Sequence, residues 1–455
     1  MRTSLFTRET TSPPPRRRTL RKAVVVAAVA ALGAGLLAGC AEDSGDPESS
    51  SSSGGKGKGK TTITVGVFGA FGLKEAGLYD AYMKLHPEIN IEQTSIERNE
   101  NYYPQLLTHL ASGSGLADIQ AIEVNNIAEI AQTQSSKLVD LGKTAGVKKE
   151  NFLEWKWSQG TDKSGKTIAL GTDIGPQGIC YRKDLFEKAG LPTDREEVGA
   201  LWAGDWQKFI EAGEKYKAKA PKGTAFIDSA SGLMAAVQGG SAKRYYDENG
   251  EVIYKTNPAV KDAWDVAAKA ADLGLTAKLQ QFQPSWDQAI VNGTFATISC
   301  PPWMVGYIKD KGAEKTEGKW DIAAAPKSSN WGGSFLTVPE AGKNKEEAAK
   351  LVAWLTAPEQ QATFFAKRGS FPSAQAAFTL PEVADAKDPY VNDAPIGKIF
   401  SDAAKNIPVT IVGPKDLIIA QNLADVGMLQ VDQKGVSSED GWNAAVKAID
   451  NALEK

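Results

Sequence analysis

The alternation of apolar and polar positions predicts a series of strands and helices from residue 61 onward. Residues 61–68 and 89–96 alternate with a period of two, as strands do, and residues 117–124 form a third apolar run. Apolar positions recur with helical spacing between these runs. The repeated order of strand, helix and strand predicts a parallel sheet with helices on both faces.

The rest of the chain is also mixed, and it is long enough for more than one core. Helical periodicity continues at 202–217, 258–271 and 345–356, and strand-like runs occupy 295–299 and 335–338. Roughly 395 residues follow the first 60, which is more than one compact core usually contains. We therefore expect two globular α/β units.

Residues 150–181 interrupt this rhythm with two short extended runs and a pair of tryptophans. Trp155 and Trp157 are two positions apart, and side chains with this spacing point to opposite sides of an extended segment. One of the two rings is expected to be buried and the other to be available to a ligand.

The N-terminal segment has the pattern of an export signal. Residues 16–22 are rich in arginine and lysine, and residues 23–37 are almost wholly Ala, Val, Leu and Gly. The tetrad Leu-Ala-Gly-Cys that ends at Cys40 resembles the lipobox of bacterial lipoproteins. The resemblance implies that residues 1–40 are a signal peptide and that Cys40 becomes the lipidated first residue of the mature protein. An ordinary signal peptide, or a membrane helix with an incidental cysteine, is the alternative.

Residues 41–60 are predicted to form a flexible tether, because they are rich in Ser, Gly and Lys and contain no large apolar side chain. Residues 54–61 match the phosphate-loop pattern G-x-x-x-x-G-K-T. A nucleotide site needs a buried strand before this loop and a helix after it. A serine tract precedes the match and a predicted strand follows it, so we interpret the match as compositional.

The charge balance argues against a nucleic-acid partner. The chain has 52 Lys and Arg against 55 Asp and Glu, a net charge of −3 without a basic stripe. It also contains 11 Trp, 11 Tyr and 15 Phe. Tryptophan is favoured where a large, flat, amphipathic surface is needed, so part of these rings is expected to line a binding site.

Cysteine use fits an exported protein. With Cys40 lipidated, Cys180 and Cys300 remain, each at the end of an apolar run that resembles a strand. An even pair of cysteines in an oxidising location is often bridged, so we predict a Cys180–Cys300 disulfide. Two buried free thiols are the alternative.

Four blocks of sequence resemble carbohydrate-type extracellular solute-binding proteins, the receptors of ABC sugar importers. They follow one another in the family's order along the mature chain. The blocks are 171–192, which begins Gly-Thr-Asp-Ile-Gly-Pro; 292–306, which contains Pro302 and Trp303; 331–349, which begins Trp-Gly-Gly-Ser; and 368–372, Arg-Gly-Ser-Phe-Pro.

The resemblance implies an α/β periplasmic-binding-protein fold, with two lobes joined by three hinge crossovers and the ligand in the cleft between them. The crossovers are expected near Asp173, Trp331 and Phe371. The implied boundaries are 61–173 plus 331–371 for the first lobe and 174–330 plus 372–455 for the second.

A sugar presents C–H faces that pack on aromatic rings and hydroxyls that bond to charged and amide side chains. In doubly wound lobes such side chains are expected at the carboxyl ends of strands. The expected ligand contacts that follow from this chemistry and from the crossovers are Phe71, Arg98, Glu123, Asp173, Trp286, Trp331, Gly333 and Arg368. The resemblance adds Trp303 as a stacking ring.

Each of these residues also has a structural alternative. Phe71, Trp286 and Trp331 would serve as core rings, the polar cluster at Glu123 as a helix cap, Arg98 as a solvated loop charge, and Asp173 and Arg368 as hinge anchors.

The leading hypothesis is a monomeric receptor, lipid-anchored on the extracellular face of the cell membrane, that captures an oligosaccharide and delivers it to ABC permease subunits. Residues 171–176 and 300–303 are similar to those of cello-oligosaccharide binders. Chito-oligosaccharides, xylo-oligosaccharides and maltodextrins use the same chemistry of rings and carboxylates and stay open as substrates.

Two other functions remain as alternatives. A lipid-tethered glycoside hydrolase needs two carboxylates about 5 to 10 Å apart, which Glu123 and Asp173 would supply, but the chain lacks the repetition of barrel hydrolases. A tethered adhesin or sensor is the other. With two histidines and no H-E-x-x-H, C-x-x-C or G-x-S-x-G motif, neither a metal site nor a cofactor is expected.

Overall fold

The computed structural model describes residues 59–454. The predicted signal peptide, Cys40 and nearly all of the predicted tether lie outside the described residues, as does most of the match to the phosphate loop. None of the helices between residues 59 and 454 is both long enough and apolar enough to cross a membrane.

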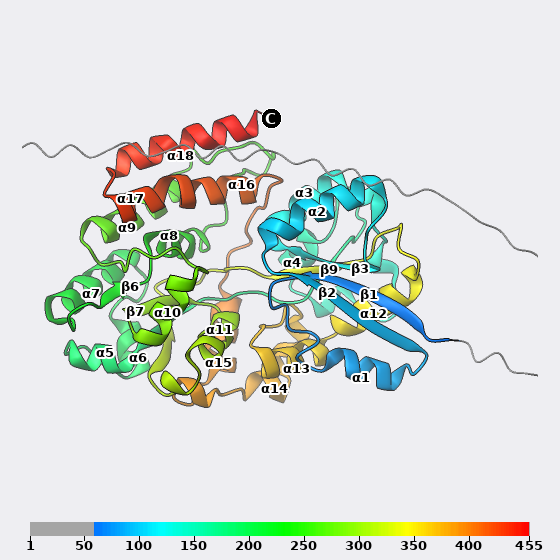
Figure 1. The fold of residues 1–455 in the computed structure, drawn as a ribbon, viewed down its shortest axis with the longest axis horizontal. Coiled ribbons are helices and arrows are strands. Elements are labelled where there is room, and N and C mark those ends of the chain that lie inside the picture. The colour runs from blue at the N-terminus through cyan, green and yellow to red at the C-terminus, as the bar shows by residue number, and fades with distance from the viewer. Residues whose placement is uncertain (1–58, 455) are drawn as a thin grey trace, which may run out of the picture. The chain divides into compact units, whose positions relative to one another are not determined.

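The described residues form two α/β lobes, each built on its own sheet (Figure 1). The sheet of the first lobe has the order β2-β1-β3-β9-β4, and that of the second lobe has the order β6-β7-β5-β8. The strands of the first sheet are β1 (Thr61–Phe68), β2 (Ile89–Ile96), β3 (Ile119–Glu123), β4 (Leu170–Gly171) and β9 (Ser334–Thr337). Those of the second are β5 (Gly178–Arg182), β6 (Ala225–Ile227), β7 (Phe295–Cys300) and β8 (Trp320–Ala324).

Helices surround both sheets. Those of the first part of the chain are α1 (Leu78–Leu85), α2 (Asn99–Ser112), α3 (Val124–Thr133) and α4 (Glu154–Gln159). The middle of the chain forms α5 (Lys183–Lys188), α6 (Arg195–Ala200), α7 (Trp206–Lys219), α8 (Ala230–Gln238), α9 (Pro258–Asp272), α10 (Pro284–Asn292) and α11 (Pro302–Gly312). The last part forms α12 (Lys345–Leu355), α13 (Pro358–Arg368), α14 (Pro381–Ala384), α15 (Ile396–Lys405), α16 (Asp416–Gln421), a π-helical segment (Asn422–Met428), α17 (Leu429–Lys434) and α18 (Ser438–Leu453).

The first sheet confirms the predicted parallel arrangement only for its three N-terminal strands. β1 pairs in parallel with β2 and with β3, and the strand bounds of β1 and β2 agree with the alternating runs in the sequence. β9 returns from the second lobe and pairs antiparallel with β3 and β4. The sheet is therefore mixed. Strands joined by a crossover helix run parallel, but β9 enters the sheet from the second lobe without such a helix and can run in the opposite direction.

Local sequence signals begin and end two helices of the second lobe. Asn257 precedes α9, and its side chain accepts a hydrogen bond from the backbone N–H of Ala259, as an N-cap does. α10 has Pro284 in its first turn and ends at Gly293, whose φ of 69° suits glycine.

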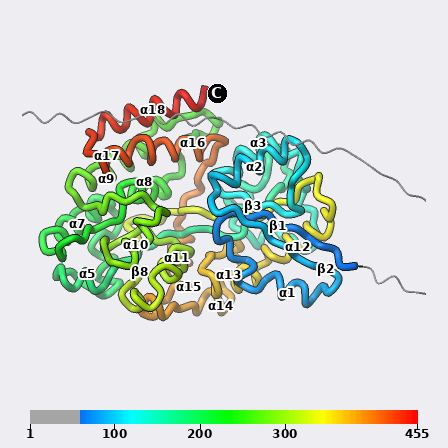
Figure 2. The backbone as a smooth tube through the Cα atoms, viewed as in Figure 1, coloured from blue at the N-terminus to red at the C-terminus, as the bar shows by residue number. Residues whose placement is uncertain are grey.

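The chain passes from one sheet to the other between β4 and β5 and again between β8 and β9 (Figure 2). Isolated backbone bridges join these two segments to each other and to the segment at Phe371, which leads on to helices. The N–H of Ile174 donates to the carbonyl of Phe371 at 2.8 Å, and the N–H of Trp331 donates to the carbonyl of Gly175 at 2.8 Å. The segments predicted as crossovers thus lie side by side. The residue boundaries of the two lobes given above remain our proposal.

The core of the second lobe surrounds β5 and β7, which pair antiparallel. Cys180 on β5 and Cys300 on β7 are joined by a disulfide, with their Cα atoms 5.3 Å apart. Both cysteines are fully buried.

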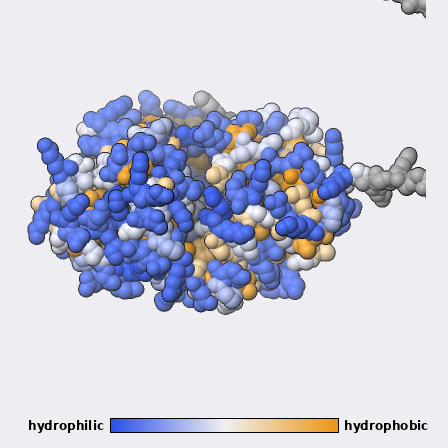
Figure 3. Space-filling model, turned by 60° about the horizontal axis from the view of Figure 1, so that its bottom comes forward, coloured by the Kyte–Doolittle hydropathy of each residue, from blue (hydrophilic) through white to orange (hydrophobic). Residues whose placement is uncertain are grey.

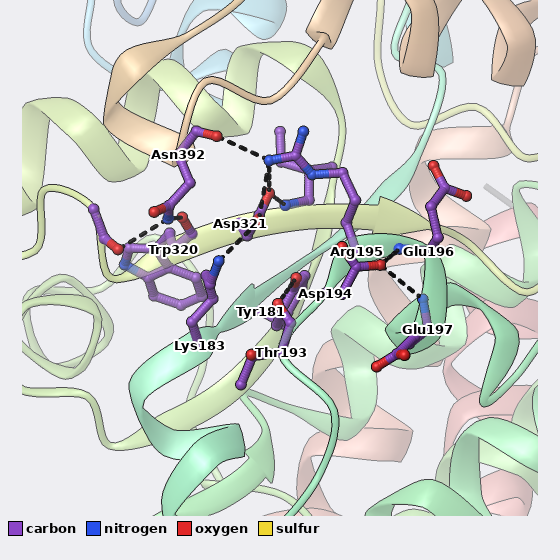
Figure 4. Close-up of polar contacts among 12 residues, drawn as sticks. Tyr181, Lys183, Thr193, Asp194, Arg195, Glu196, Glu197, Trp320, Asp321 and Asn392 are labelled. Carbon is purple, nitrogen blue, oxygen red and sulfur yellow. Dashed lines mark hydrogen bonds and ion pairs between the residues drawn. The ribbon is translucent and has the colours of Figure 1, made fainter.

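A charged cluster on the second lobe attaches the C-terminal part of the chain to β8 (Figure 4). The carboxylate of Asp321, buried on β8, lies 3.0 Å from the guanidinium of Arg195 and 3.7 Å from Nζ of Lys183. Arg195 also donates to the carbonyl of Asn392 at 2.9 Å, and the Asn392 amide donates to the carbonyl of Trp320 at 2.9 Å. Because these groups bond to one another, the cluster has a structural role.

Candidate functional site

A cleft of about 300 Å³ lies between the two lobes. This volume is at the lower end of the range typical of small-molecule sites. Its base is formed by the crossover residues 330–332. The first lobe contributes Arg98, Glu100, Val124, Asn125, Trp155 and Gln159. The second lobe contributes residues that include Ser231, Met234, Gln238, Arg244, Tyr245, Gln280, Gln281, Phe282, Thr410, Gln421 and Asp425.

Exposed apolar side chains concentrate near this cleft. The large exposed hydrophobic residues among those described are Leu85, Val252, Phe282, Val409 and Val426. Phe282 lines the cleft, and Val409 and Val426 are next in sequence to residues that line it. On the face shown in Figure 3, by comparison, hydrophobic residues form small patches among hydrophilic ones.

Trp331 stands at the base of the cleft, where the sequence predicted a contact. Its ring is edge-on to that of Trp303, with the centroids 4.9 Å apart, and the indole N–H of Trp303 donates to the Trp331 carbonyl at 3.1 Å. Gly332 follows with a φ of 88°, a conformation that glycine adopts without strain. Trp303 does not line the cleft itself and supports Trp331 from the side.

Phe282 is a cleft residue that sequence reasoning missed. Its side chain is 42% exposed although its φ is 62°, which is unusual for a bulky residue. Its ring centroid lies 5.1 Å from that of Trp286, 6.3 Å from that of Trp303 and 6.1 Å from that of Trp331. No local pattern marks Phe282, since it sits in a short polar loop and acquires its neighbours only through folding.

Trp155 also lines the cleft, but the reason given for it from the sequence was wrong. The segment is the helix α4 and not an extended run, so Trp155 and Trp157 do not alternate between two sides. Both rings are partly buried; Trp157 packs against Phe152, with centroids 5.6 Å apart, and the residue between the two tryptophans, Lys156, is buried.

A buried cluster of charges lies next to the base of the cleft. Asp173 is 8% exposed and accepts hydrogen bonds from the Thr172 hydroxyl and from the backbone N–H of Ser334, both at 2.8 Å. Glu123 accepts from the backbone N–H of Asn125 at 2.8 Å and so caps α3. Lys156 lies 3.7 Å from the ring centroid of Phe335, and its Nζ has no hydrogen-bond partner among residues 59–454.

The protonation of this cluster is shifted by burial. Burial raises the pKa of Glu123 from 4.5 to about 7, against the opposing effects of the Asn125 hydrogen bond and of the positive charges of Lys156 and Arg244. Burial also lowers the pKa of Lys156 to about 8, although Asp173 and Glu123 favour its charged form. Both groups therefore titrate near neutral pH.

Because Gly333 has no side chain, Lys156 and Asp173 can pack closely against the crossover segment that contains it. A Cβ atom at Gly333, whose φ is 106°, would lie 2.8 Å from Nζ of Lys156 and 2.9 Å from the carbonyl oxygen of Asp173. Glu123, Asp173 and Gly333 are thus brought together as the sequence suggested, but beside the cleft and not in its lining. Asn125, two positions beyond the Glu123 cap, lines the cleft in their place.

Arg98 lines the rim of the cleft, as its place after the second strand suggested. Its Nε lies 3.3 Å from a carboxylate oxygen of Glu100, and both side chains are about half exposed. On the second lobe, the Gln280 amide donates to Asp425 at 3.3 Å. The cleft is therefore bordered by an ion pair and by a carboxylate that is hydrogen-bonded to an amide.

Three further predicted contacts, besides Trp303 and the charged cluster, also lie away from the cleft lining. Phe71 packs edge-on against Phe68 on the first-lobe core, with centroids 5.6 Å apart. Trp286 is fully buried in the second-lobe core, where its indole N–H donates to Asp228 at 2.9 Å. Arg368 ends α13, 3.4 Å from the carboxylate of Asp310. In each case the structural alternative describes the geometry, because core packing or an ion pair already occupies the side chain.

Within residues 59–454, no group of three or more His, Cys, Asp or Glu side chains is arranged to hold a metal ion.

Comparison with known proteins places this geometry in a family. The family model for bacterial extracellular solute-binding proteins matches residues 77–390. The lactose-binding protein of Rhizobium radiobacter is 26% identical over 357 residues, which cover 75% of this chain and 80% of that protein.

Solved structures agree with this result. A crystal structure of an extracellular solute-binding protein of family 1 has a TM-score of 0.77 and 40% identity, and the match covers 86% of this chain and 99% of that one. The ABC transporter-associated binding protein of B. animalis subsp. lactis, in complex with β-1,6-galactobiose, has a TM-score of 0.73 over 87% of this chain and 98% of that one. At 20% identity, the second match shows the fold alone.

Proposed function

Because the chain belongs to the bacterial extracellular solute-binding proteins, we propose that it captures a short oligosaccharide outside the cell membrane and delivers it to the permease of an ABC transporter. The observation that carries this proposal is the composition of the cleft. The rings of Trp155, Phe282 and Trp331 line it together with the amides of Asn125, Asn330 and several glutamines. Rings suit the C–H faces of a sugar, and amides both donate to and accept from its hydroxyls.

The proposed substrate is a β-1,4-linked disaccharide, with cellobiose as the first candidate. The cello-oligosaccharide assignment comes from the sequence resemblance at residues 171–176 and 300–303. The relative from Rhizobium radiobacter is a lactose-binding protein. Cellobiose and lactose share a β-1,4 linkage to glucose and differ in the configuration of one hydroxyl, so a single site shape accommodates both.

The predicted site residues take different parts in this proposal. Trp331 and Arg98 contact the sugar from the cleft lining. Trp303 holds the Trp331 ring in place. Glu123, Asp173 and Gly333 act from beside the base, where they keep the crossover in its conformation.

We further propose binding without catalysis, by a monomer anchored through a lipid on Cys40. The carboxylates that line the cleft among the described residues are Glu100 and Asp425, and each is paired with a neighbouring side chain on its own lobe. The glycoside hydrolase is therefore not favoured.

The test of the proposed function is a thermal-shift and calorimetric screen of a soluble form that starts at Ala41. The screen uses cellobiose, lactose, maltose, xylobiose and diacetylchitobiose. A ligand at a hundred times its Kd stabilises the folded state by about 2.7 kcal/mol, so cellobiose or lactose is expected to raise the Tm by a few degrees and to be recovered intact. Absence of a shift with every sugar, or cleavage of the sugar, would overturn the proposal.

The anchor has its own test. Cys40→Ser is expected to release the protein from the membrane fraction of expressing cells while sugar binding is unchanged. A variant that remains with the membrane would contradict the proposed lipid anchor.

A further inference from the structure

Gln238, the last residue of α8, presents an unused hydrogen-bond donor at the cleft. The side chain lines the cleft and is 4% exposed. Its Oε1 accepts a hydrogen bond from the Tyr245 hydroxyl at 2.7 Å, whereas its Nε2 has no partner among the described residues. Buried polar groups are nearly always paired, so an amide fixed on one side and unpaired on the other points to an acceptor supplied from outside the chain.

Arg244 presents a second unused donor on the same wall of the cleft. One of its terminal nitrogens lies 3.3 Å from the carboxylate of Asp416, which is itself buried. The Nε of Arg244 is buried and has no partner among residues 59–454. The guanidinium carbon lies over the ring of Tyr245, 5.5 Å from its centroid. Tyr245 therefore orients both donors, Gln238 through its hydroxyl and Arg244 through its ring.

We propose that Gln238 and Arg244 form a donor pair that binds an acceptor oxygen of the captured sugar, with Tyr245 and Asp416 as positioning residues. The inference rests on the proposed function. It assigns to the second-lobe wall of the cleft a subsite that determines which sugar is bound. Arginine has no acceptor atom, and the acceptor of the Gln238 amide is already occupied by Tyr245. The subsite therefore recognises an oxygen that accepts hydrogen bonds, such as a hydroxyl or ring oxygen.

The charges around the pair indicate a neutral sugar and not a uronic acid. Asp416 pairs with Arg244, and Glu123 on the first lobe lies close enough to Arg244 to feel its positive charge. Because Asp416 already neutralises the guanidinium, a sugar carboxylate at this subsite would be repelled by Asp416. Arg98, the other cation that lines the cleft, is paired with Glu100.

The test measures binding of cellobiose, lactose and cellobiouronic acid by calorimetry to the soluble form that starts at Ala41 and to three variants of it. Gln238→Met removes the amide at similar length, Arg244→Lys keeps the cation beside Asp416 but removes Nε, and Tyr245→Phe removes only the hydroxyl that fixes Gln238. The first two are expected to weaken binding about tenfold, as the loss of a buried hydrogen bond does. Tyr245→Phe is expected to weaken it about threefold and to add nothing in the Gln238→Met background, a non-additivity that general destabilisation would not produce.

Tyr254→Phe is the matched control. Tyr254 belongs to the same buried cluster as Tyr245, and its hydroxyl donates to Asp450 at 2.8 Å, outside the cleft lining. The control is expected to lower the Tm of the free protein without changing the affinity for either sugar. Melting of each variant without ligand confirms that it is folded, and Arg244→Lys keeps the test decisive if Gln238→Met does not fold.

The outcomes separate the two proposals. Wild-type protein that binds none of the sugars removes the proposed function and the donor pair with it. Wild-type binding with unchanged affinity in the Gln238→Met and Arg244→Lys variants overturns the donor pair alone. Tighter binding of cellobiouronic acid than of cellobiose overturns the assignment to neutral sugars.

Discussion

Nζ of Lys415, which precedes α16 in the second lobe, lies 3.3 Å from Oε1 of Glu129 on α3 of the first lobe. The other carboxylate oxygen of Glu129 accepts from the Tyr103 hydroxyl at 2.7 Å, so its orientation is fixed. Leu417 packs against the first-lobe core near this pair. The ion pair therefore joins the two lobes, in a fold whose expected movement is hinge closure around a ligand.

Lys415→Met is expected to favour the open arrangement of the lobes. The pair is partly exposed, so its loss is worth about 0.5 to 1 kcal/mol, or roughly a twofold to fivefold weaker affinity for sugar. Small-angle scattering of the sugar-free variant should give a larger radius of gyration than that of the wild type. Lys255→Met is the control, because Lys255 pairs with Asp450 at 2.7 Å within the second lobe. An unchanged radius of gyration in Lys415→Met would show that the pair does not hold the lobes together.

Phe282→Ala is expected to weaken sugar binding by about 2 kcal/mol, which is typical of an aromatic side chain that dominates an interface. Phe282→Gly should lose the same affinity while keeping the fold, because glycine adopts the φ of 62° at this position without strain. Calorimetric titration measures the affinity, and urea unfolding measures stability. Leu85→Ala, which truncates an exposed apolar residue elsewhere on the first lobe, is the control. Full affinity in both Phe282 variants would remove this ring from the site.

Glu123 is expected to make the protein less stable as the pH rises toward neutrality. Its pKa is about 7 in the folded state against an ordinary value of 4.5, so between these values the folded state holds a proton that the unfolded state has lost. The contribution of Glu123 to the free energy of unfolding is fully present below pH 4.5, and it is lost as the pH rises to about 7. Burial also raises the pKa of Asp228 and Asp416 to about 6. These two groups therefore lower the free energy of unfolding as the pH rises to about 6, and change it little above that pH.

The interval from pH 6 to 7 therefore isolates Glu123. Urea unfolding of the wild type is expected to give a lower free energy at pH 7 than at pH 6, and Glu123→Gln should abolish this decline. Lys156 acts in the opposite direction and at higher pH, because its lowered pKa of about 8 makes stability rise above that value. A decline of the same size in Glu123→Gln would assign it to another group.

Reduction of the disulfide between Cys180 and Cys300 is expected to destabilise the second lobe. The bond closes a loop of 120 residues in the unfolded chain. Loops of this length give about 5 kcal/mol of stabilisation in the chain-entropy account. Urea unfolding of the Cys180→Ala, Cys300→Ala double variant measures the loss, and mass spectrometry after alkylation without reductant checks the bond. Two alkylated cysteines in the unreduced wild type would contradict it.

Much of the first lobe was predictable because its signals are local. Alternating runs define β1 and β2 at 61–68 and 89–96, and the helices between them follow from periodicity and from terminal glycines and prolines. α4 was the exception. Its six residues are too few for a helical period to show, so Trp155 and Trp157 gave the appearance of an extended pattern.

The cleft was only partly predictable. Arg98 was found because it follows the strand β2, and Trp331 because it lies on a crossover. Both positions place the backbone at the edge of a sheet or between the lobes, where a ligand is expected. Trp286 and Phe71 fit the same rule but point into cores, since the sequence does not show which side of a helix or turn will be covered by distant segments.

The amino-acid sequence by itself determined the strand-helix order of the first lobe, the balanced charge and the family resemblance, because these depend on residue type and on spacing along the chain. Only the tertiary structure decided that β9 joins the first sheet antiparallel and that Phe282, Gln238 and Arg244 share one wall of the cleft. It also decided that Lys415 meets Glu129, 286 residues away. Such contacts form between segments that fold far from one another in sequence, and their energy arises from burial and pairing that no local pattern contains.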